Sequence, residues 1–401
     1  MSAGPDCLRQ LCVVLVSETL SEQHRRTAGQ ALENRGFEVF ADRPLPDAAF
    51  PSWPNSVVRE GGRVLIAFNP LIEDQAQTTG EVYVDPATDS AVYHLGAVLG
   101  PAASGLRVAV TARQATALCR HVLSPSEMQT LRTQIAARRE EMRTDEPVFA
   151  DLSRFKHRAK VELVEWNGQK AVKKTFRATA RAEMAREVAF HEDIAPLSGV
   201  PARILARSKN ALYFEHIDKH APGRAVPGLP VPALMPLDSV RQLAEFARLV
   251  TGRGWDPVDL TPRDNILIER RSGALRGIDF EFAFCRDAPV DIEDACFLSG
   301  IGDAHFSGLP LDAAMRRDPY AGKWRPQTGL SKRSFLHDPA WLQRIKRALV
   351  HPIWLILRAP GGLWRRRVYL AERAAILSAL AWHEDWDDGA PEVRQKEAGL
   401  T

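Results

Sequence analysis

A turn-rich loop running into an apolar strand is encoded by VDLTPRDNILI at residues 258–268. Proline, aspartate and asparagine favour turns, whereas the aliphatic run that ends the stretch favours a strand. A second motif, GIDFEFA, follows at residues 277–283. The two motifs place three oxygen-bearing side chains, Asp259, Asn265 and Asp279, next to short apolar segments.

The chain before these motifs predicts a β-hairpin followed by a helix. Residues 161–166 alternate as a strand does, Asn167-Gly168 is a strong two-residue turn, and residues 169–176 form the return strand. Ala171 and Lys173 lie two apart on that strand and therefore share a face. The further elements expected are a helix at 181–194, strands at 203–206 and 211–214, and a helix at 240–250.

This order of features resembles the protein-kinase-like superfamily, especially its aminoglycoside and choline kinase branch, whose metal-binding motif often reads IDFE, and the lipopolysaccharide kinases. The resemblance covers about Phe149 to Gly300, and the C-terminal extension is less recognisable. It implies an α+β bilobal protein-kinase-like domain that binds ATP and Mg²⁺. It also implies phosphoryl transfer to a hydroxyl group, a reaction that asks the protein mainly for positioning and charge neutralisation.

The resemblance gives each candidate residue a role. The catalytic candidate is Asp259, which would orient or deprotonate the acceptor hydroxyl. The metal candidates are Asn265 and Asp279. The nucleotide-binding candidates are Lys173 on the phosphates, Glu187 tying that lysine, Ala171 against the base, and the backbone from Glu215 to Ile217 as the adenine hinge. Lys174 competes with Lys173, and Glu183 competes with Glu187.

Three departures from the family pattern stand in the same region. Asn265 lies six places after Asp259 rather than five, and Asp264 occupies the fifth place, so either side chain is a candidate metal ligand. Pro257 stands where the family has a histidine two residues before the aspartate. Residues 152–160 contain no glycine but four Lys/Arg, which either contact phosphates directly or form a solvated edge.

The first 122 residues predict an α/β domain with a mostly parallel, Rossmann-like sheet, because short apolar runs alternate with helical patterns. No glycine-rich phosphate motif follows any of these runs, so a scaffold or partner-binding role is an equal alternative. The strands expected here are residues 11–16, 37–41, 63–68, 81–84 and 106–111, with a helix at 22–34.

A connecting helix is predicted to start at Ser124 and to run to about Arg143. Ser124 is an N-cap, Pro125 suits the first helical position, and Glu127 completes a capping box. Residues 144–147 then break the helix. The expected domains are therefore 1–122, a connecting helix and linker at 123–147, a kinase-like N-lobe at 148–218 and a C-lobe at 219–401.

Composition indicates a globular protein of the cell interior. The chain has 401 residues, 45% apolar and 26% charged, which suits two or three domains. Neither a secretory signal nor an apolar run of membrane-spanning length is recognisable. The five scattered cysteines suit a reducing compartment, so we expect a cytoplasmic protein without a structural metal.

One segment departs from the near-neutral charge of the chain. Residues 316–367 hold thirteen Lys/Arg against two acids, in a chain whose net charge is +3. Four tryptophans and a short apolar run lie in the same segment. This combination suits an anionic membrane surface, which would place the protein at the inner face of the membrane, or an acidic glycolipid. Nucleic acid would satisfy the charge as well but is not the expected partner, and packed C-lobe helices with a solvated basic face are the equal alternative.

The resemblance therefore implies an ATP- and Mg²⁺-dependent phosphotransferase acting on a small-molecule or glycolipid acceptor, and the acceptor we expect is a lipopolysaccharide-core sugar. Only a short stretch separates Asp279 from Asp291, which leaves no room for the segment on which protein substrates dock. A non-catalytic kinase-like binding module is the first alternative, and a Ser/Thr protein kinase is the second.

Overall fold

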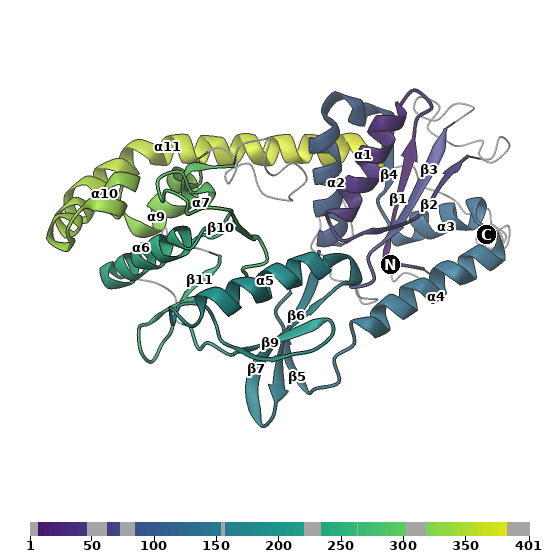
Figure 1. The fold of residues 1–401 in the computed structure, drawn as a ribbon. Helices are drawn as coiled ribbons and strands as arrows, with labels where there is room; N and C mark the ends of the chain where they lie inside the picture. The colour runs from purple at the N-terminus through teal and green to yellow at the C-terminus, as the bar shows by residue number, and fades with distance from the viewer. Residues whose placement is uncertain are drawn as a thin grey trace, which may run out of the picture. The chain divides into compact units, whose positions relative to one another are not determined.

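The computed structural model describes residues 7–45, 62–72, 85–153, 157–219, 234–262, 264–301 and 318–382, which divide between two compact units (Figure 1). The first unit comprises residues 1–143, 154–157 and 368–401, and the second comprises residues 144–153 and 158–367. The strand expected at 81–84 lies outside the described residues.

The first unit is built on a five-stranded sheet with the order β14-β4-β1-β3-β2. Strand β1 reads LCVVLV and is buried along its whole length. The bounds of the strands are β1 Leu11–Val16, β2 Glu38–Pro44, β3 Arg63–Phe68, β4 Leu106–Ala109 and β14 Ala381–Trp382.

The expectation of a mostly parallel, Rossmann-like sheet is wrong for the described strands. Strand β1 is antiparallel to both of its neighbours, β3 and β4, and β2 is antiparallel to β3. The parallel neighbours in this sheet are β14 and β4, where Ala381 pairs with Val108. A continuous apolar run indicates that a strand is buried on both faces, and it carries no information about the direction of the neighbouring strand.

Helices cover both faces of this sheet (Figure 1). On one face, Val14 and Leu65 pack in a cluster with α1 (Glu22–Glu33), α2 (Pro86–Leu99) and the last turns of α11 (Ala340–Leu380). On the other face, Val13 and Ile66 pack with α3 (Ala112–Val122) and α4 (Pro125–Glu141). The burial of β1 follows from this double cover.

Helix α4 begins as the sequence predicts, because Ser124 and Glu127 form the capping box. It is part of the first unit rather than a free connector, since its Leu131 and Ile135 are buried in the cluster beneath the sheet. The C-terminal end of the chain also differs from expectation. Residues 368–382 belong to the first unit, where β14 pairs with β4, and not to a C-lobe.

The second unit opens with an antiparallel five-stranded sheet of order β5-β6-β7-β9-β8. The predicted hairpin is confirmed: Trp166 pairs with Gln169, and Asn167 and Gly168 have φ of 50° and 75°, as a tight turn of this hand requires. The bounds are β5 Val148–Asp151, β6 Ala159–Trp166, β7 Gln169–Phe176, β8 Ile204–Arg207 and β9 Ala211–Glu215.

Helix α5 (Arg181–Ile194) packs on this sheet, as the sequence predicts for residues 181–194. Its Met184 and Val188 lie in one buried cluster with Phe176 of β7 and Phe214 of β9. The helix is preceded by the short helical turn η2 (Ala178–Ala180). One face of β7 is thereby held against one face of α5.

Among the described residues of this unit, four further short strands form two ladders. Strand β10 (Trp255–Pro257) pairs with β13 (Ala283–Cys285), and β11 (Ile266–Ile268) pairs with β12 (Leu275–Gly277). The loops that carry Asp259 and Asp279 connect these strands.

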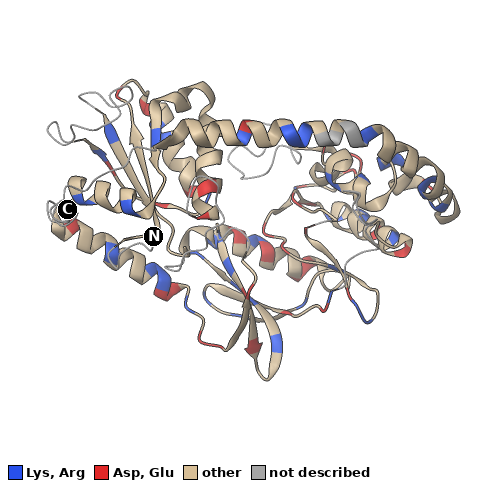
Figure 2. Cartoon of the chain, turned by 180° about the vertical axis from the view of Figure 1, so that it is seen from behind, with Lys and Arg blue, Asp and Glu red and all other residues tan. Residues whose placement is uncertain are grey.

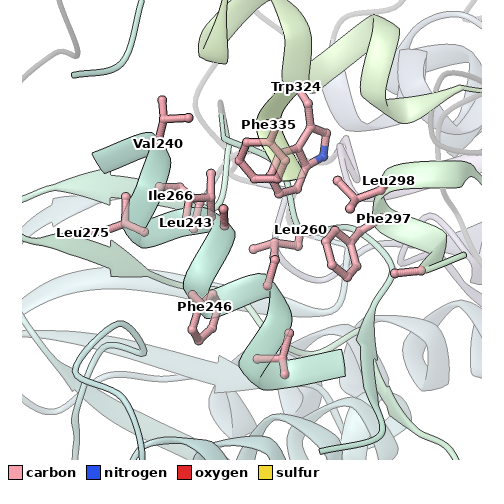
Figure 3. Close-up of a cluster of buried hydrophobic side chains, with 14 of the residues drawn as sticks. Val240, Leu243, Phe246, Leu260, Ile266, Leu275, Phe297, Leu298, Trp324 and Phe335 are labelled. Atoms are coloured by element: carbon pink, nitrogen blue, oxygen red, sulfur yellow. The ribbon is translucent and has the colours of Figure 1, made fainter. Parts of the chain in front are cut away.

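Around the ladders lie helices that enclose a large apolar core (Figure 3). Phe246 of α6, Leu260, Phe297 of α7, Trp324 and Phe335 of α10 contribute to it. The helices are α6 Leu237–Gly252, α7 Cys296–Ser299, η3 Tyr320–Trp324, α9 Arg325–Thr328, α10 Lys332–His337 and the part of α11 up to Arg367.

In the described part of the chain, no helix combines the length and the apolarity needed to cross a bilayer.

Candidate functional site

A buried lysine holds three carboxylates together in the second unit. Lys174 Nζ lies 2.8 Å from Glu187 Oε2, 2.5 Å from Asp279 Oδ1 and 2.9 Å from Glu281 Oε2. Lys174 comes from β7, Glu187 from α5, and the other two from the loop between β12 and β13. Burial alone would lower the pKa of Lys174, but the charges of Asp279, Glu187 and Glu281 outweigh it and raise the pKa well above its usual value. The lysine is therefore a fixed cation.

The expected pair between Lys173 and Glu187 does not form, and this assignment is corrected to Lys174. Neighbouring residues on a strand point to opposite faces, and the face of β7 that carries Lys174 is the one against α5. Lys173 lies on the other face, where its Nζ is 2.7 Å from Glu146 Oε2 and 5.4 Å from the Tyr213 ring centroid.

Ala171 shares the face of Lys173 and is fully buried there, in register with Glu215. The residue two places before Lys174, on the same face, is Val172, which packs in the cluster with α5. Val172, and not Ala171, therefore shares a strand face with the lysine that pairs with Glu187.

Glu187 is fully buried and links α5 to the loop of Asp279. Its second oxygen, Oε1, accepts a hydrogen bond of 3.3 Å from the backbone N–H of Phe280. Burial raises the pKa of Glu187 to about 7, because it outweighs the favourable charge of Lys174. Glu183, the rival candidate, pairs instead with Arg186 of its own helix at 3.0 Å.

Asp279 has a left-handed backbone, with φ of 64°, a conformation uncommon for residues other than glycine. The next residue fixes it there: Phe280 is fully buried and stacks on Phe190 of α5 at 4.2 Å between ring centroids. Gly277 allows this arrangement, because a Cβ atom at that position would lie 2.7 Å from the Phe280 ring. The Asp279 carboxylate is thereby held at the surface of the core while remaining accessible.

Glu281 and Arg158 are the site residues that the sequence interpretation missed. Arg158 Nε lies 2.6 Å from Glu281 Oε1, and its guanidinium sits 4.5 Å from the centre of the Phe282 ring. Burial would raise the pKa of Glu281, but Lys174 and Arg158 hold it at about 2. Arg158 Nη1 is shielded from solvent with no hydrogen-bond partner among the described residues. Arg158 thus brings a second cation to the site from the segment that precedes β6.

Asp259 lies in the electrostatic field of the same cluster. Its Oδ1 is shielded from solvent and has no hydrogen-bond partner within the described ranges. Burial, followed by the charges of Asp279 and Glu281, raises the pKa of Asp259 well above its usual value. A carboxyl group in this state is suited to hold or accept a proton.

Asn265 is the residue that faces Asp279. Its Nδ2 lies 3.4 Å from the Asp279 carbonyl oxygen, and its own carbonyl accepts from the Ile278 N–H at 2.9 Å. Asp264 Oδ2 lies 3.9 Å from Lys323 Nζ instead. The geometry therefore favours Asn265 over Asp264 as a neighbour of the carboxylate cluster.

A buried aspartate supports the loop that carries Asp259. Asp256 on β10 lies 2.8 Å from Arg286 Nη2, and its Oδ1 accepts from the Cys296 N–H at 3.0 Å. These contacts tie β10 to β13 and to the start of α7. Asp256 is a structural anchor that the sequence interpretation also did not single out.

Glu215 and Ile217 lie where the sheet ends. Glu215 pairs with Arg276, and its Oε1 accepts from the Arg203 N–H at 2.7 Å. Ile217 packs on the cluster that contains Phe214 and Val172. The side chain of Glu215 is thus engaged in holding β8 and β12, and only its backbone is a candidate for contact with a base.

The donor set fits a divalent cation. Ligand oxygens of Glu187, Asp279 and Glu281 lie within 4.8 Å of one another, and Asp259 brings a further carboxyl oxygen without a hydrogen-bond partner in the described structure. Hard carboxylate and amide oxygens are the ligands of Mg²⁺. The charges of neighbouring carboxylates help to raise the pKa values of Asp259 and Glu187, so an added cation would favour the ionised forms of both groups.

Of the two missed site residues, Glu281 had a signal in the sequence, because it belongs to the IDFE motif itself. Lys174 had been named as the rival of Lys173. Arg158 offered no comparable signal, because it is one of four Lys/Arg in a segment without a recognisable pattern.

Comparison with known protein families finds no family model that matches this chain. A search of the curated proteins finds no relative either.

Proposed function

We propose that the chain is an ATP- and Mg²⁺-dependent phosphotransferase that phosphorylates a hydroxyl group of a non-protein acceptor. The observation that carries the proposal is the contact of one buried strand lysine, Lys174, with both Glu187 of the neighbouring helix and Asp279 of the IDFE motif. Phosphoryl transfer in the kinase-like superfamily uses a lysine–glutamate pair of this kind together with a metal-binding aspartate. The antiparallel sheet with helix α5 packed on it is the arrangement expected of the N-lobe of that superfamily.

In the proposed reaction the acceptor oxygen attacks the γ-phosphorus of ATP, the bond from that phosphorus to the bridging oxygen breaks, and ADP leaves. The hydroxyl proton passes to the Asp259 carboxylate, whose raised pKa suits a proton acceptor. Lys174 would contact the α- and β-phosphates. Asn265 and Asp279 would hold Mg²⁺, which neutralises phosphate charge when bound.

The acceptor is proposed to be a sugar or glycolipid of the lipopolysaccharide-core type. Eleven residues separate Asp279 from Asp291, so the chain offers no long segment on which a folded protein substrate would dock. The basic character of residues 316–367 favours an acidic acceptor.

The test is transfer of label from γ-labelled ATP to lipopolysaccharide-core oligosaccharide and to simple sugars, with ADP measured in parallel. We expect equal amounts of phosphorylated acceptor and ADP. The variant Asp259→Asn should lower kcat by about 10²- to 10⁴-fold, which is the usual contribution of a positioned base, while its melting temperature stays near native. If the chain binds ATP but forms no ADP with every acceptor tested, the result would contradict a phosphotransferase.

A non-catalytic kinase-like binding module is the second candidate. Two observations favour it: residues 152–160 lack the glycines of a phosphate-covering loop, and Arg158 of this segment is paired with Glu281. Two results together would favour the binding module. The native chain would form ADP at a rate near zero, and Asp259→Asn would bind nucleotide as the native chain does and form ADP at the same near-zero rate.

A further inference from the structure

Helix α11 presents an apolar face to solvent along its length in the second unit. The exposed fraction reaches 72% for Ile356 and 77% for Leu357, and Trp341 and Trp364 at the two ends are 62% and 67% exposed. From Trp341 to Ile353 these residues are four apart, Ile356 and Leu357 follow three and four places after Ile353, and Trp364 lies seven places after Leu357, so they lie toward one side of the helix. The exposed members are Trp341, Ile345, Leu349, Ile353, Ile356, Leu357 and Trp364.

The opposite face of the same helix packs on the second unit. Gln343 and His351 are buried, and Arg347 donates to the Met235 carbonyl at 2.5 Å. Trp354 lies between Arg325 and Arg358, whose guanidinium groups are 4.4 and 5.0 Å from its ring centroid. The helix is therefore attached to the second unit through this opposite face, and the exposed apolar face does not contribute to its attachment.

The part of helix α11 that belongs to the second unit carries charge of one sign. From Ala340 to Arg367 it holds seven Lys/Arg and no Asp or Glu, and Figure 2 shows blue bands on this part of α11. Lys346 pairs with Asp338 at 2.7 Å, while Arg344 and the run Arg365 to Arg367 are exposed. A solvated helix usually mixes both signs, so cations alone beside an apolar face complement an anionic surface that has an apolar interior.

We propose that the outward face of α11 between Trp341 and Trp364 binds an anionic lipid bilayer, with the helix lying in the plane of the interface. The apolar side chains would enter the acyl region, the tryptophans would sit at the headgroup level, and the exposed arginines would contact lipid phosphates. This proposal stands independently of phosphoryl transfer, because it uses no residue of the candidate site.

The test is sedimentation of the full-length chain with phosphatidylcholine vesicles, with and without phosphatidylglycerol, at low and at high salt. We expect binding to the anionic vesicles that weakens at high salt. Replacing Arg365, Arg366 and Arg367 by Gln should weaken binding about tenfold or more. The double variant Ile356→Ser/Leu357→Ser should weaken it at both salt concentrations, since the lost apolar burial is not screened.

Matched controls separate the face from general effects. Replacing the exposed Lys209, Arg241 and Arg271 by Gln removes the same charge elsewhere on the second unit, and Val148→Ser/Leu197→Ser removes exposed apolar groups elsewhere. These controls should bind as the native chain does, and melting curves check that every variant folds.

A depth measurement identifies the face directly. Brominated lipids should quench tryptophan emission in the native chain and should quench it much less in Trp341→Phe/Trp364→Phe. The proposal is overturned if the chain stays in the supernatant with anionic vesicles at low salt, or if the serine variant binds normally. Self-association that is lost in the serine variant would show that the face binds a second copy of the chain. Binding to DNA without binding to vesicles would show that it binds nucleic acid. Either result would overturn the proposal.

Discussion

Lys174 Nζ lies 2.8 Å from Glu187 Oε2, so a buried ion pair joins the central strand β7 to helix α5. The adjacent Lys173 points to the opposite face and pairs with Glu146. The two lysines form a matched pair of test positions, because they are consecutive, both buried and both salt-bridged. We therefore propose the nucleotide-binding role for Lys174 and not for Lys173.

Lys174→Met is expected to weaken ATP binding in the presence of Mg²⁺ by about tenfold or more, since a hydrogen bond to a charged group contributes about 1.5–3 kcal/mol. Calorimetric titration measures the dissociation constant. Lys173→Met is the control and should bind ATP with near-native affinity. Equal losses in both variants would remove Lys174 from the proposed role.

Removing Lys174 is also expected to destabilise the second unit. Three carboxylates would lose their common cation, and breaking a buried ion pair by deleting one partner typically costs about 3–5 kcal/mol. Lys174→Met/Glu187→Gln should recover part of this loss, because the second change removes one uncompensated charge. Urea unfolding of the three chains measures the difference, and no recovery in the double variant would show that the pair is not coupled.

Asn265 and Asp264 can be distinguished by their effect on the metal. Asn265→Ala should raise the Mg²⁺ concentration needed for nucleotide binding by about tenfold or more, the scale seen when groups around a metal are removed. Asp264→Ala should leave the required Mg²⁺ concentration near that of the native chain, because Asp264 contacts Lys323 and Thr261. The opposite order would mean that Asp264 takes the metal.

Glu127 gives the first unit a pH-dependent contribution to stability. Hydrogen bonds from Arg43 and from Ser124 lower the pKa of Glu127 from 4.5 to about 2. Because the folded-state pKa is depressed, the stabilisation is present above about pH 4.5 and is lost as the pH falls toward 2. Glu127→Gln should therefore have a lower melting temperature than the native chain at pH 7. The difference between the two melting temperatures should become smaller as the pH falls from about 4.5 toward 2.

The control for this prediction is Glu18→Gln, an exposed carboxylate of the same unit. It should melt as the native chain does throughout. If the difference in melting temperature between Glu127→Gln and the native chain stays constant from pH 7 down to about pH 2, the capping box does not depend on the ionised carboxylate.

The cysteines should differ in reactivity. Burial raises the pKa of Cys12, Cys119 and Cys296 to about 12, and it is the largest cause in each case. Since the thiolate is the reactive form, these three should react with a thiol reagent only after unfolding. Cys285 is exposed and Cys7 is half-buried. A chromogenic thiol reagent should therefore label at most two of the five cysteines in the native chain. Rapid reaction of a third thiol would contradict the burial of one of them.

Local features were predictable from the sequence, whereas choices between faces were not. The Asn167-Gly168 turn and the Ser124 capping box depend on neighbouring residues alone, and both are confirmed. In β7, both faces are buried from Lys173 onward, so alternation of polar and apolar residues gives no sign of which lysine faces α5. The packing of Val172 and Phe176 against α5 decides it, and that contact joins distant parts of the chain.

The same limit explains the other differences. An apolar strand such as β1 reports burial on two faces but not the direction of its partners, which were antiparallel where parallel ones were expected. Arg158 reaches Glu281 across 123 positions of sequence, and no local pattern announces such a contact. The loops that carry Asp259 and Asp279 do connect paired strands, and Asn265 lies beside Asp279, but whether the three residues form one functional site stays a prediction.

The most direct test of the proposed nucleotide site is the shift in melting temperature caused by ATP, with and without Mg²⁺, in the native chain and in Asp279→Ala. A ligand that binds only the folded state must stabilise it, by about 2.7 kcal/mol when its concentration is 100 times the dissociation constant. The account predicts a Mg²⁺-dependent rise in the native chain that disappears in Asp279→Ala. No rise at millimolar ATP with Mg²⁺, or an equal rise in the variant, would contradict it.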